Sequence, residues 1–138
     1  MEPEDRFKVL FMLNSFGTGG SERVVLDICR GMNRDVFEPF VVSLYCGELS
    51  GEFDKIQVWN RCFDIKDGVY LPVMLRFANI LRNKKIDVVN AHHFSPFIHS
   101  YLGSMMNRCS LIYTDHTVHE IRQIPSYWAM IGTLLLKT

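Results

Sequence analysis

The sequence predicts a single α/β domain with a mostly parallel, doubly wound sheet. Short apolar runs of strand length alternate with longer segments of helical periodicity, which is typical of βαβ units. A glycine-rich break separates the first apolar run from the first helical segment. The chain of 138 residues is long enough to bury one hydrophobic core. The four clearest predicted strands are residues 9–13, 40–45, 87–91 and 111–114.

The break after the first strand is the central feature of the sequence. We call it the glycine loop, residues 14–20, which read Asn-Ser-Phe-Gly-Thr-Gly-Gly. Glycines allow left-handed backbone angles and a close approach of N–H groups to a ligand. Ser21 is the predicted N-cap of a helix that ends near residues 31–33. Because a helix N-terminus carries unpaired N–H groups and a partial positive charge, the loop is predicted to receive a phosphate-bearing ligand.

Two common phosphate-binding motifs do not fit this loop. Glu22 stands where the third glycine of a dinucleotide-binding G-x-G-x-x-G would fall, and no G-K-[ST] opens the helix. A tight turn that only folds the helix back on the strand remains the alternative to a ligand site.

The rest of the chain continues the alternation. Residues 47–52 form a polar, glycine-bearing loop, and residues 56–59 form a weak strand near an edge of the sheet. Ser95 and Pro96 are the predicted N-cap and first residue of a later helix. The predicted helices beyond the first are residues 70–83, 95–106 and 125–136.

Polar side chains recur where the predicted strands end. In doubly wound sheets the carboxyl ends of the strands meet at one edge, and ligands bind there. The sequence therefore predicts a binding cleft at this edge. The polar residues at the strand ends are Asn14, Ser15, His92, His93, Asp115 and His116.

Three segments, taken in order, resemble the N-terminal, acceptor-side half of family 4 glycosyltransferases, which have the GT-B architecture. Residues 19–25 are similar to the family's G-G-x-E-R-V-V, residues 87–93 to its D-[VI]-[VI]-H-x-H, and residues 113–116 to its [TY]-x-H. Asn90 departs from this pattern, which often has histidine there, whereas His92 stays in register. The resemblance implies a Rossmann-like, three-layer α/β/α fold.

The resemblance also implies a role for each matching residue. The backbone at Gly19 and Gly20 would approach the diphosphate of the donor. His92 would be the catalytic residue, in contact with the transferred sugar, and Glu22 would face the acceptor side. The remaining residues of the implied acceptor or sugar cleft are Asn14, Ser15, Asp115 and His116.

The implied reaction is a retaining transfer, of the hexosyltransferase type, from a nucleotide-sugar donor to a glycan or lipid-linked acceptor. No metal or other cofactor is expected. GT-B enzymes hold the nucleotide mainly with a C-terminal domain that carries an E-x7-E motif, and this sequence contains no such segment. Residues 1–138 are therefore expected to be one incomplete N-terminal domain that is inactive without the C-terminal domain.

The same residues suggest two other functions. A non-catalytic nucleotide- or flavin-binding α/β module is the alternative, because flavodoxin-like folds also place an anion loop after the first strand. A yellow purified protein would favour the flavin. A zinc site is disfavoured, since His116-x-x-His119-Glu120 is not H-E-x-x-H.

The remaining polar residues near the strand ends have plainer interpretations. Adjacent His92 and His93 on an extended backbone are expected to point to opposite sides. His93 and His99 are interpreted as packing or surface residues, and Asp115 is as readily a helix cap as a ligand. No role is assigned to Asn90 or His119.

Composition excludes several classes of protein. Fifteen basic and fifteen acidic residues cancel, unlike the basic footprint of a nucleic-acid binder. The acidic start is not a signal peptide, and no apolar run approaches the roughly 18 residues that span a bilayer. Cys29, Cys46 and Cys109 are interpreted as buried thiols of a reducing compartment, which favours a cytoplasmic location. The apolar residues 125–136 are interpreted as a helix that lacks its covering partner domain, which favours self-association. Peripheral contact with the inner face of the membrane is the less favoured alternative, because the helix has no basic face.

Overall fold

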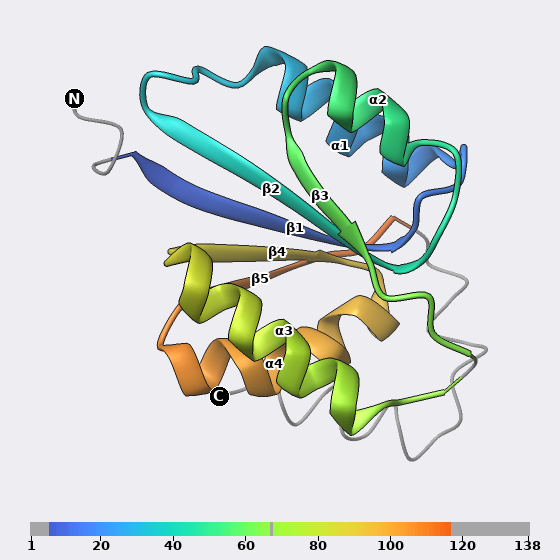
Figure 1. Ribbon diagram of the computed structural model, residues 1–138, viewed down its shortest axis with the longest axis vertical. Helices are drawn as coiled ribbons and strands as arrows, with labels where there is room; N and C mark the ends of the chain where they lie inside the picture. The colour runs from blue at the N-terminus through green and yellow to red at the C-terminus, as the bar shows by residue number, and fades with distance from the viewer. Residues whose placement is uncertain (1–5, 67, 117–138) are drawn as a thin grey trace.

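The computed structural model describes residues 6–66 and 68–116. Strands and helices alternate along these residues, as predicted (Figure 1). The elements are β1 (Phe7–Ser15), α1 (Gly20–Gly31), β2 (Phe37–Tyr45), α2 (Ser50–Lys55), β3 (Trp59–Cys62), α3 (Leu71–Lys84), β4 (Val88–His92), α4 (Phe94–Asn107) and β5 (Ser110–Thr114).

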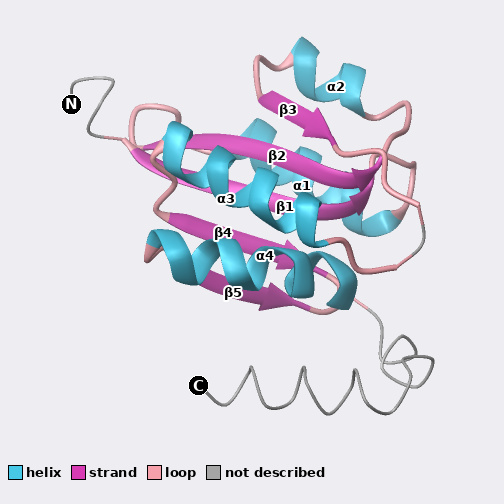
Figure 2. Cartoon of the chain, turned by 60° about the horizontal axis from the view of Figure 1, so that its bottom comes forward, coloured by secondary structure: helices cyan, strands magenta, loops and turns pink. Residues whose placement is uncertain are grey.

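The strands form one sheet in the order β3-β2-β1-β4-β5, and every pairing is parallel (Figure 2). Val9 of β1 lies opposite Pro39 of β2 and opposite Val88 of β4. The strand order runs outward in one direction from β1 to β3 and in the other direction from β4 to β5. The predicted doubly wound, parallel sheet is thereby confirmed, with its topological switch between β1 and β4.

Helices cover both faces of the sheet. Figure 1 shows α1 and α2 on one side of the strands and α3 and α4 on the other. Leu10 and Met12 of β1 belong to the core beneath α3 and α4, whereas Phe11 and Leu13 belong to the core beneath α1 and α2. All four side chains are almost fully buried. The continuous apolar run of β1 is explained by this burial on both faces.

Two predicted segments on the α1 side have different bounds. Residues 50–52 of the predicted polar loop are helical, because α2 begins at Ser50 and inserts Phe53 into the core. The short strand occupies Trp59–Cys62 instead of residues 56–59. Gln57 has a left-handed φ of 56° and breaks the chain inside the segment predicted as extended. The location of this strand at an edge of the sheet is confirmed.

The prediction that Ser21 caps α1 is wrong. α1 begins at Gly20, and its N-cap is the extended residue Gly19. The Ser21 hydroxyl instead donates a hydrogen bond to Oε2 of Glu22 at 2.8 Å.

The prediction that Ser95 caps α4 is also wrong. α4 begins at Phe94, and its N-cap is His93. Pro96 lies inside the first turn of the helix, where its missing N–H costs no intrahelical hydrogen bond.

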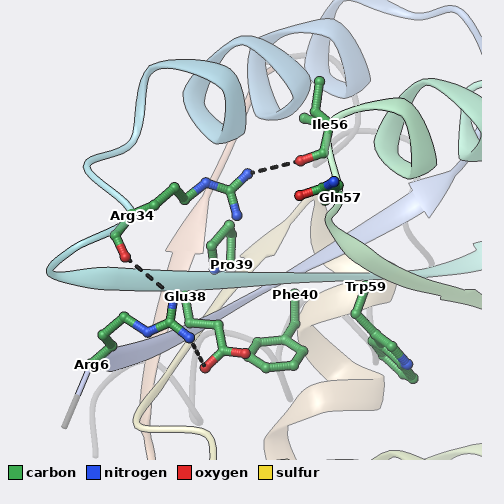
Figure 3. A pocket seen from close by; sticks show the side chains of 8 residues that line it. All are labelled: Arg6, Arg34, Glu38, Pro39, Phe40, Ile56, Gln57 and Trp59. Atoms are coloured by element: carbon green, nitrogen blue, oxygen red, sulfur yellow. Dashed lines mark hydrogen bonds and ion pairs between the residues drawn. The ribbon is translucent and has the colours of Figure 1, made fainter. Parts of the chain in front are cut away.

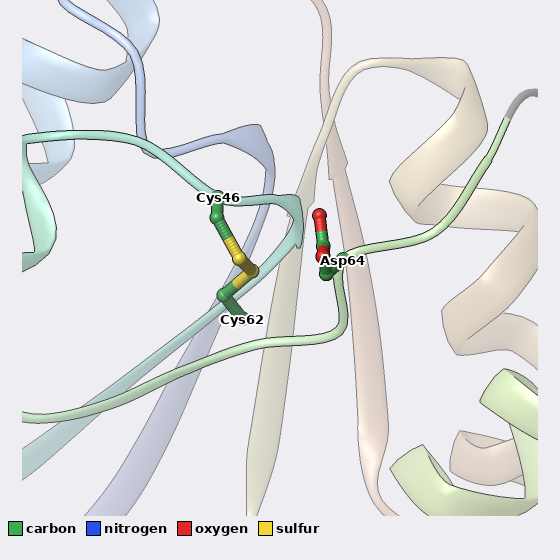
Figure 4. Close-up of side chains that lie close together, drawn as sticks. All are labelled: Cys46, Cys62 and Asp64. Carbon is green, nitrogen blue, oxygen red and sulfur yellow. A yellow bond between two sulfur atoms is a disulfide. The ribbon is translucent and has the colours of Figure 1, made fainter.

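Cys46 and Cys62 form a disulfide between the turn after β2 and the last residue of β3, with Cα atoms 5.3 Å apart (Figure 4). The prediction of Cys46 as a buried free thiol is therefore wrong. Cys29 is free and buried as predicted, and burial raises the pKa of its thiol to about 12. Cys109 is free and half-buried. Because disulfides are typical of oxidising compartments, the cysteines no longer support a cytoplasmic location.

Among the described residues, no helix has the length and apolar character that crossing a membrane requires. The predicted helix at residues 125–136, with its expected self-association and membrane contact, lies outside the described residues, as does His119.

Reduction of the Cys46–Cys62 bond should lower the free energy of unfolding by about 3 kcal/mol, because it releases a loop with a sequence separation of 16 in the unfolded chain. Urea unfolding of the chain with and without a reductant measures this difference. The double variant Cys46→Ser/Cys62→Ser is the control, and a reductant should leave its midpoint unchanged. A wild-type urea midpoint that is the same with and without the reductant would contradict the prediction.

Candidate active site

The carboxyl ends of β1, β4 and β5 come together beside the topological switch. The glycine loop follows β1, His92 closes β4, and β4–β5 pairing places His92 opposite Thr114 of β5. Hydrogen bonds and ring contacts connect six side chains here, which we call the strand-end cluster. Its members are Ser15, Ser21, Glu22, His92, His93 and His116.

Glu22 is the buried carboxylate of the strand-end cluster. It is only 6% exposed, yet it forms no ion pair within the described residues. Ser15 Oγ donates to its Oε1 at 3.2 Å, and Ser21 Oγ donates to its Oε2 at 2.8 Å. Ser15 Oγ also accepts a hydrogen bond from the N–H of Gly17. Hydroxyl donors and the positive end of the α1 dipole therefore stabilise a carboxylate that pairs with no cation among the described residues.

The glycine loop lies directly on this carboxylate. A Cβ atom at Gly19 would come within 2.5 Å of Glu22 Oε2, so only glycine fits without moving the side chain. Gly20, the first residue of α1, has open space around the same position. The two predicted anion-binding residues thus differ: a Cβ atom at Gly19 would displace the end of the Glu22 side chain, whereas one at Gly20 would meet nothing within 4 Å.

The turn that follows β2 packs against the backbone of the glycine loop. Leu49 N–H donates to the carbonyl oxygen of Phe16 at 2.9 Å. A Cβ atom at Gly47 would collide with the Phe16 carbonyl group and come within 2.9 Å of the Gly17 nitrogen. The turn after β2, which carries Cys46, is therefore packed against the backbone of the glycine loop.

His92 is a buried imidazole whose two ring nitrogens differ in their surroundings. It is 1% exposed, and its Nδ1 lies 2.7 Å from Nε2 of His116, whose ring stacks on it. Its Nε2 is buried and has no hydrogen-bond partner in the part of the chain that the structure describes. Burial, together with the nearby His116 and His93, lowers the pKa of His92 to about 4, against the opposing attraction of Glu22. His92 is therefore neutral at pH 7.

His93 is the residue that the sequence interpretation missed. Its ring lies 5.3 Å from the ring of His116, and its Nε2 lies 3.0 Å from Ser21 Oγ. The expectation that His92 and His93 point to opposite sides is wrong in its premise of an extended backbone. β4 ends at His92, and a φ of 75° at His93 breaks the alternation, so both rings contact His116.

The other predicted residues lie around the strand-end cluster. Asn14 is half-buried near the end of β1, and Asp115 is exposed after β5. Asn90 accepts a hydrogen bond from Thr114 Oγ1 at 2.8 Å, which ties β4 to β5. His99 is fully buried, as its interpretation as a packing residue predicts.

The arrangement brings three chemical groups to one edge of the sheet. The first turn of α1 offers N–H groups that suit an anion. Glu22 provides a buried carboxylate, and His92 provides a neutral ring whose Nε2 can donate or accept one hydrogen bond. These groups can bind a phosphate-bearing ligand and contact a polar group beside it.

One group of side chains has the spacing of metal ligands. Within residues 6–66 and 68–116, the group with suitably close ligand atoms is Cys46, Cys62 and Asp64 (Figure 4). Its two sulfur atoms are bonded to each other and are not thiolate ligands. His119 and Glu120, which belong to the disfavoured zinc site, lie outside the described residues.

A cavity of about 330 Å³ lies at the opposite end of the strands, near the start of β2 (Figure 3). The two arginines that line this cavity are bonded to other residues of the chain. Arg6 pairs with Glu38 at 3.6 Å, and Arg34 donates to the carbonyl oxygens of Cys29 and Ile56. These bonds fasten the connection between α1 and β2. The other lining residues are Pro39, Phe40, Gln57 and Trp59.

The sequence matches one protein family. Residues 18–137 match the profile of Glycosyltransferase Family 4. This agrees with the family that the three motif segments resemble. A comparison with curated proteins finds no match.

Solved structures share the fold. HepE from Anabaena, in complex with UDP-glucose, has a TM-score of 0.75 at 18% identity over 94% of this chain and 35% of its own. A glycosyltransferase from Rickettsia africae ESF-5 has a TM-score of 0.65 at 16% identity over 90% of this chain and 35% of its own. A putative UDP-N-acetylglucosamine 2-epimerase from Listeria monocytogenes has a TM-score of 0.63 at 15% identity over 94% of this chain and 37% of its own.

Gly19→Ala should lower the free energy of unfolding by about 1–3 kcal/mol, because the new methyl group displaces the Glu22 carboxylate from its hydroxyl donors. Gly20→Ala is the matched control. It places the same methyl group in open space within a helix and should be neutral or stabilising by up to about 1 kcal/mol. Urea unfolding of both variants is the measurement, and equal losses would show that the loop does not lie on Glu22.

The lowered pKa of His92 should make the fold sensitive to acid. A histidine whose pKa falls from 6.5 to about 4 on folding contributes its full stability above pH 6.5 and loses it as the pH falls towards 4. The expected loss is on the order of 1 kcal/mol per pH unit in this window. Urea unfolding at several pH values should give a shallower dependence for His92→Gln than for the wild type. An NMR titration of the His92 ring with a midpoint near 6.5 would refute the prediction.

Proposed function

Because this chain belongs to glycosyltransferase family 4, we propose that it is the N-terminal, acceptor-side domain of a retaining transferase. The enzyme would move a sugar from a nucleotide-sugar donor to a glycan or lipid-linked acceptor. The observation that carries the proposal is the strand-end cluster, where a glycine loop, the carboxylate of Glu22 and the Nε2 atom of His92, which has no partner among the described residues, lie at one edge of the sheet. In doubly wound sheets this is the edge at which ligands bind.

The donor is proposed to be a UDP-sugar. The structures of Anabaena HepE contain UDP and UDP-glucose, and the proposal extends that chemistry to this chain. The exposed backbone at Gly19 and Gly20 and the first turn of α1 would face the diphosphate. Negative charge develops on the leaving diphosphate, and preorganised N–H donors stabilise such charge. No step is proposed to need a metal ion.

His92 is proposed to contact the transferred sugar through Nε2. A buried polar atom without a partner is costly, and a sugar hydroxyl would satisfy it. The neutral ring suits this contact, because it can donate or accept a hydrogen bond without placing a charge beside the sugar. Ser15, Glu22 and His116 would line the same cleft, with Asn14 and Asp115 at its margin.

The chain spans 35% of HepE and 35% of the Rickettsia enzyme. This share supports a division of labour in which a second domain holds most of the nucleotide. We therefore expect the 138-residue chain by itself to transfer no sugar. The fold alone does not select the reaction, because a putative epimerase shares it, whereas the family match favours transfer.

The test uses a protein that carries this domain together with its nucleotide-binding domain. His92→Asn keeps a polar atom near Nδ1 for His116 but removes Nε2, and His92→Gln does the reverse. We expect His92→Asn to lower kcat about 10²–10³-fold with a UDP-hexose donor and His92→Gln to lower it less. Asp35→Asn, on the exposed turn between α1 and β2, is the control and should leave the rate unchanged.

The products decide the rest of the proposal. NMR of the glycosylated acceptor should show the anomeric configuration of the donor, and EDTA should not slow its formation. Epimerisation of the UDP-sugar without an acceptor, or a His92→Asn enzyme with the wild-type rate, would refute the proposed function or the proposed role of His92, respectively. A yellow protein would favour the flavin-binding alternative.

A further inference from the structure

We infer that His93 is a positioning residue that fastens the first turn of α1, and with it the glycine loop, to the end of β4. Its bond to Ser21 joins elements that are 72 residues apart in the chain. The consequence for catalysis rests on the proposed function, whereas the bond itself is testable without any activity.

The single proton of the Ser21 hydroxyl determines which atom donates in the bond between Ser21 and His93. A serine hydroxyl has one proton to donate, and Ser21 Oγ donates it to Oε2 of Glu22 at 2.8 Å. Ser21 Oγ can therefore only accept from His93 Nε2, 3.0 Å away. His93 must carry a proton on Nε2. Its N–H group in turn orients the Ser21 hydroxyl toward the buried carboxylate.

The backbone of His93 explains how its ring reaches α1. Its φ of 75° is a conformation that residues other than glycine rarely adopt. Its N–H donates to the carbonyl oxygen of Thr114, and its carbonyl oxygen accepts from Phe97 N–H at the start of α4. Anchored on both sides, the residue presents its ring to Ser21 and His116. Strained backbone of this kind concentrates where a side chain must be aimed.

The bond reaches the glycine loop through Glu22. Ser21 holds Oε2, and that same oxygen lies where a Cβ atom at Gly19 would be. Oε1 is held by Ser15, which also binds the N–H of Gly17. If His93 releases Ser21, the carboxylate loses an oriented donor and the loop loses the surface on which it lies. The loop and the pair His92–His116 would then no longer keep a fixed separation.

The experiment compares His93→Phe with His93→Gln in the 138-residue chain. Gln can place an amide N–H near the position of Nε2, whereas Phe fills the space without a donor. Both variants bear the same backbone strain, so their difference reports the hydrogen bond. Amide hydrogen exchange at Gly17 and Arg23, whose N–H groups are hydrogen-bonded to Ser15 Oγ and to the carbonyl oxygen of Gly19, should be about 10-fold faster in His93→Phe, the factor contributed by one ordinary hydrogen bond. His93→Gln should recover most of the wild-type protection.

Two further measurements keep the inference falsifiable if a histidine variant folds poorly. Ser21→Ala removes the bond from the other side and should accelerate exchange of the same amides, whereas Ser110→Ala, on an exposed residue of β5, should not. In the wild type, ¹⁵N NMR should show His93 with the proton on Nε2, and Ser21→Ala should shift that resonance. An Nδ1–H tautomer, or equal exchange in the Phe and Gln variants, would overturn the inference.

These outcomes are separate from the fate of the proposed function. The amide exchange rates and the tautomer of His93 report the bond between His93 and Ser21 even if no sugar is transferred. In an active transferase, His93→Phe should raise the KM for the donor at least 5-fold more than it lowers kcat, because the loop binds the donor and His92 remains in place. If the exchange rates change as expected but KM does not change more than kcat, only the consequence for catalysis is rejected.

Discussion

The pairing of β1 with both β2 and β4 is the constraint on which the rest of the structure depends. It places the first strand at the centre of the sheet and makes the strand order reverse beside it. Because all pairings are parallel, every strand ends at the same edge. Residues that are far apart in the chain, such as Ser21 and His93, or His92 and His116, can then contact one another only there.

Within the part of the chain that the structure describes, the polar groups at that edge are held by hydrogen bonds among themselves instead of by ion pairs. Glu22 relies on two hydroxyls and on the helix dipole, and each hydroxyl has a further partner. A network of this kind is directional, because each proton has one place to go. Its geometry is therefore more tightly specified than that of an ion pair. The exception is His92 Nε2, which the described residues leave unsatisfied at the point where a substrate would be expected.

Much of the architecture could be predicted because β1, β4 and the helices of residues 20–31 and 71–84 have strong apolar patterns. The cleft could be placed because polar residues follow apolar strands. Three features escaped prediction for identifiable physical reasons. The ring of His93 is aimed by one backbone dihedral angle, which leaves no trace in a pattern of polar and apolar residues. The Ser21 hydroxyl donates to the Glu22 carboxylate instead of accepting from the N–H groups of the helix N-terminus. The disulfide joins cysteines whose proximity exists only after β2 and β3 pair.

The central position of β1 also governs the order in which the chain can fold as it is made. Val88, which lies opposite Val9, emerges from the ribosome 79 residues later (88 − 9), which takes roughly 4–16 s at about 5–20 residues per second. During that interval β1, β2 and β3 can assemble with α1 and α2, so one face of the nascent sheet is covered. The opposite face, with Leu10, Met12 and Phe40, waits for α3 and α4. An apolar surface thus remains open on each growing chain, and that surface is what chaperones recognise during synthesis.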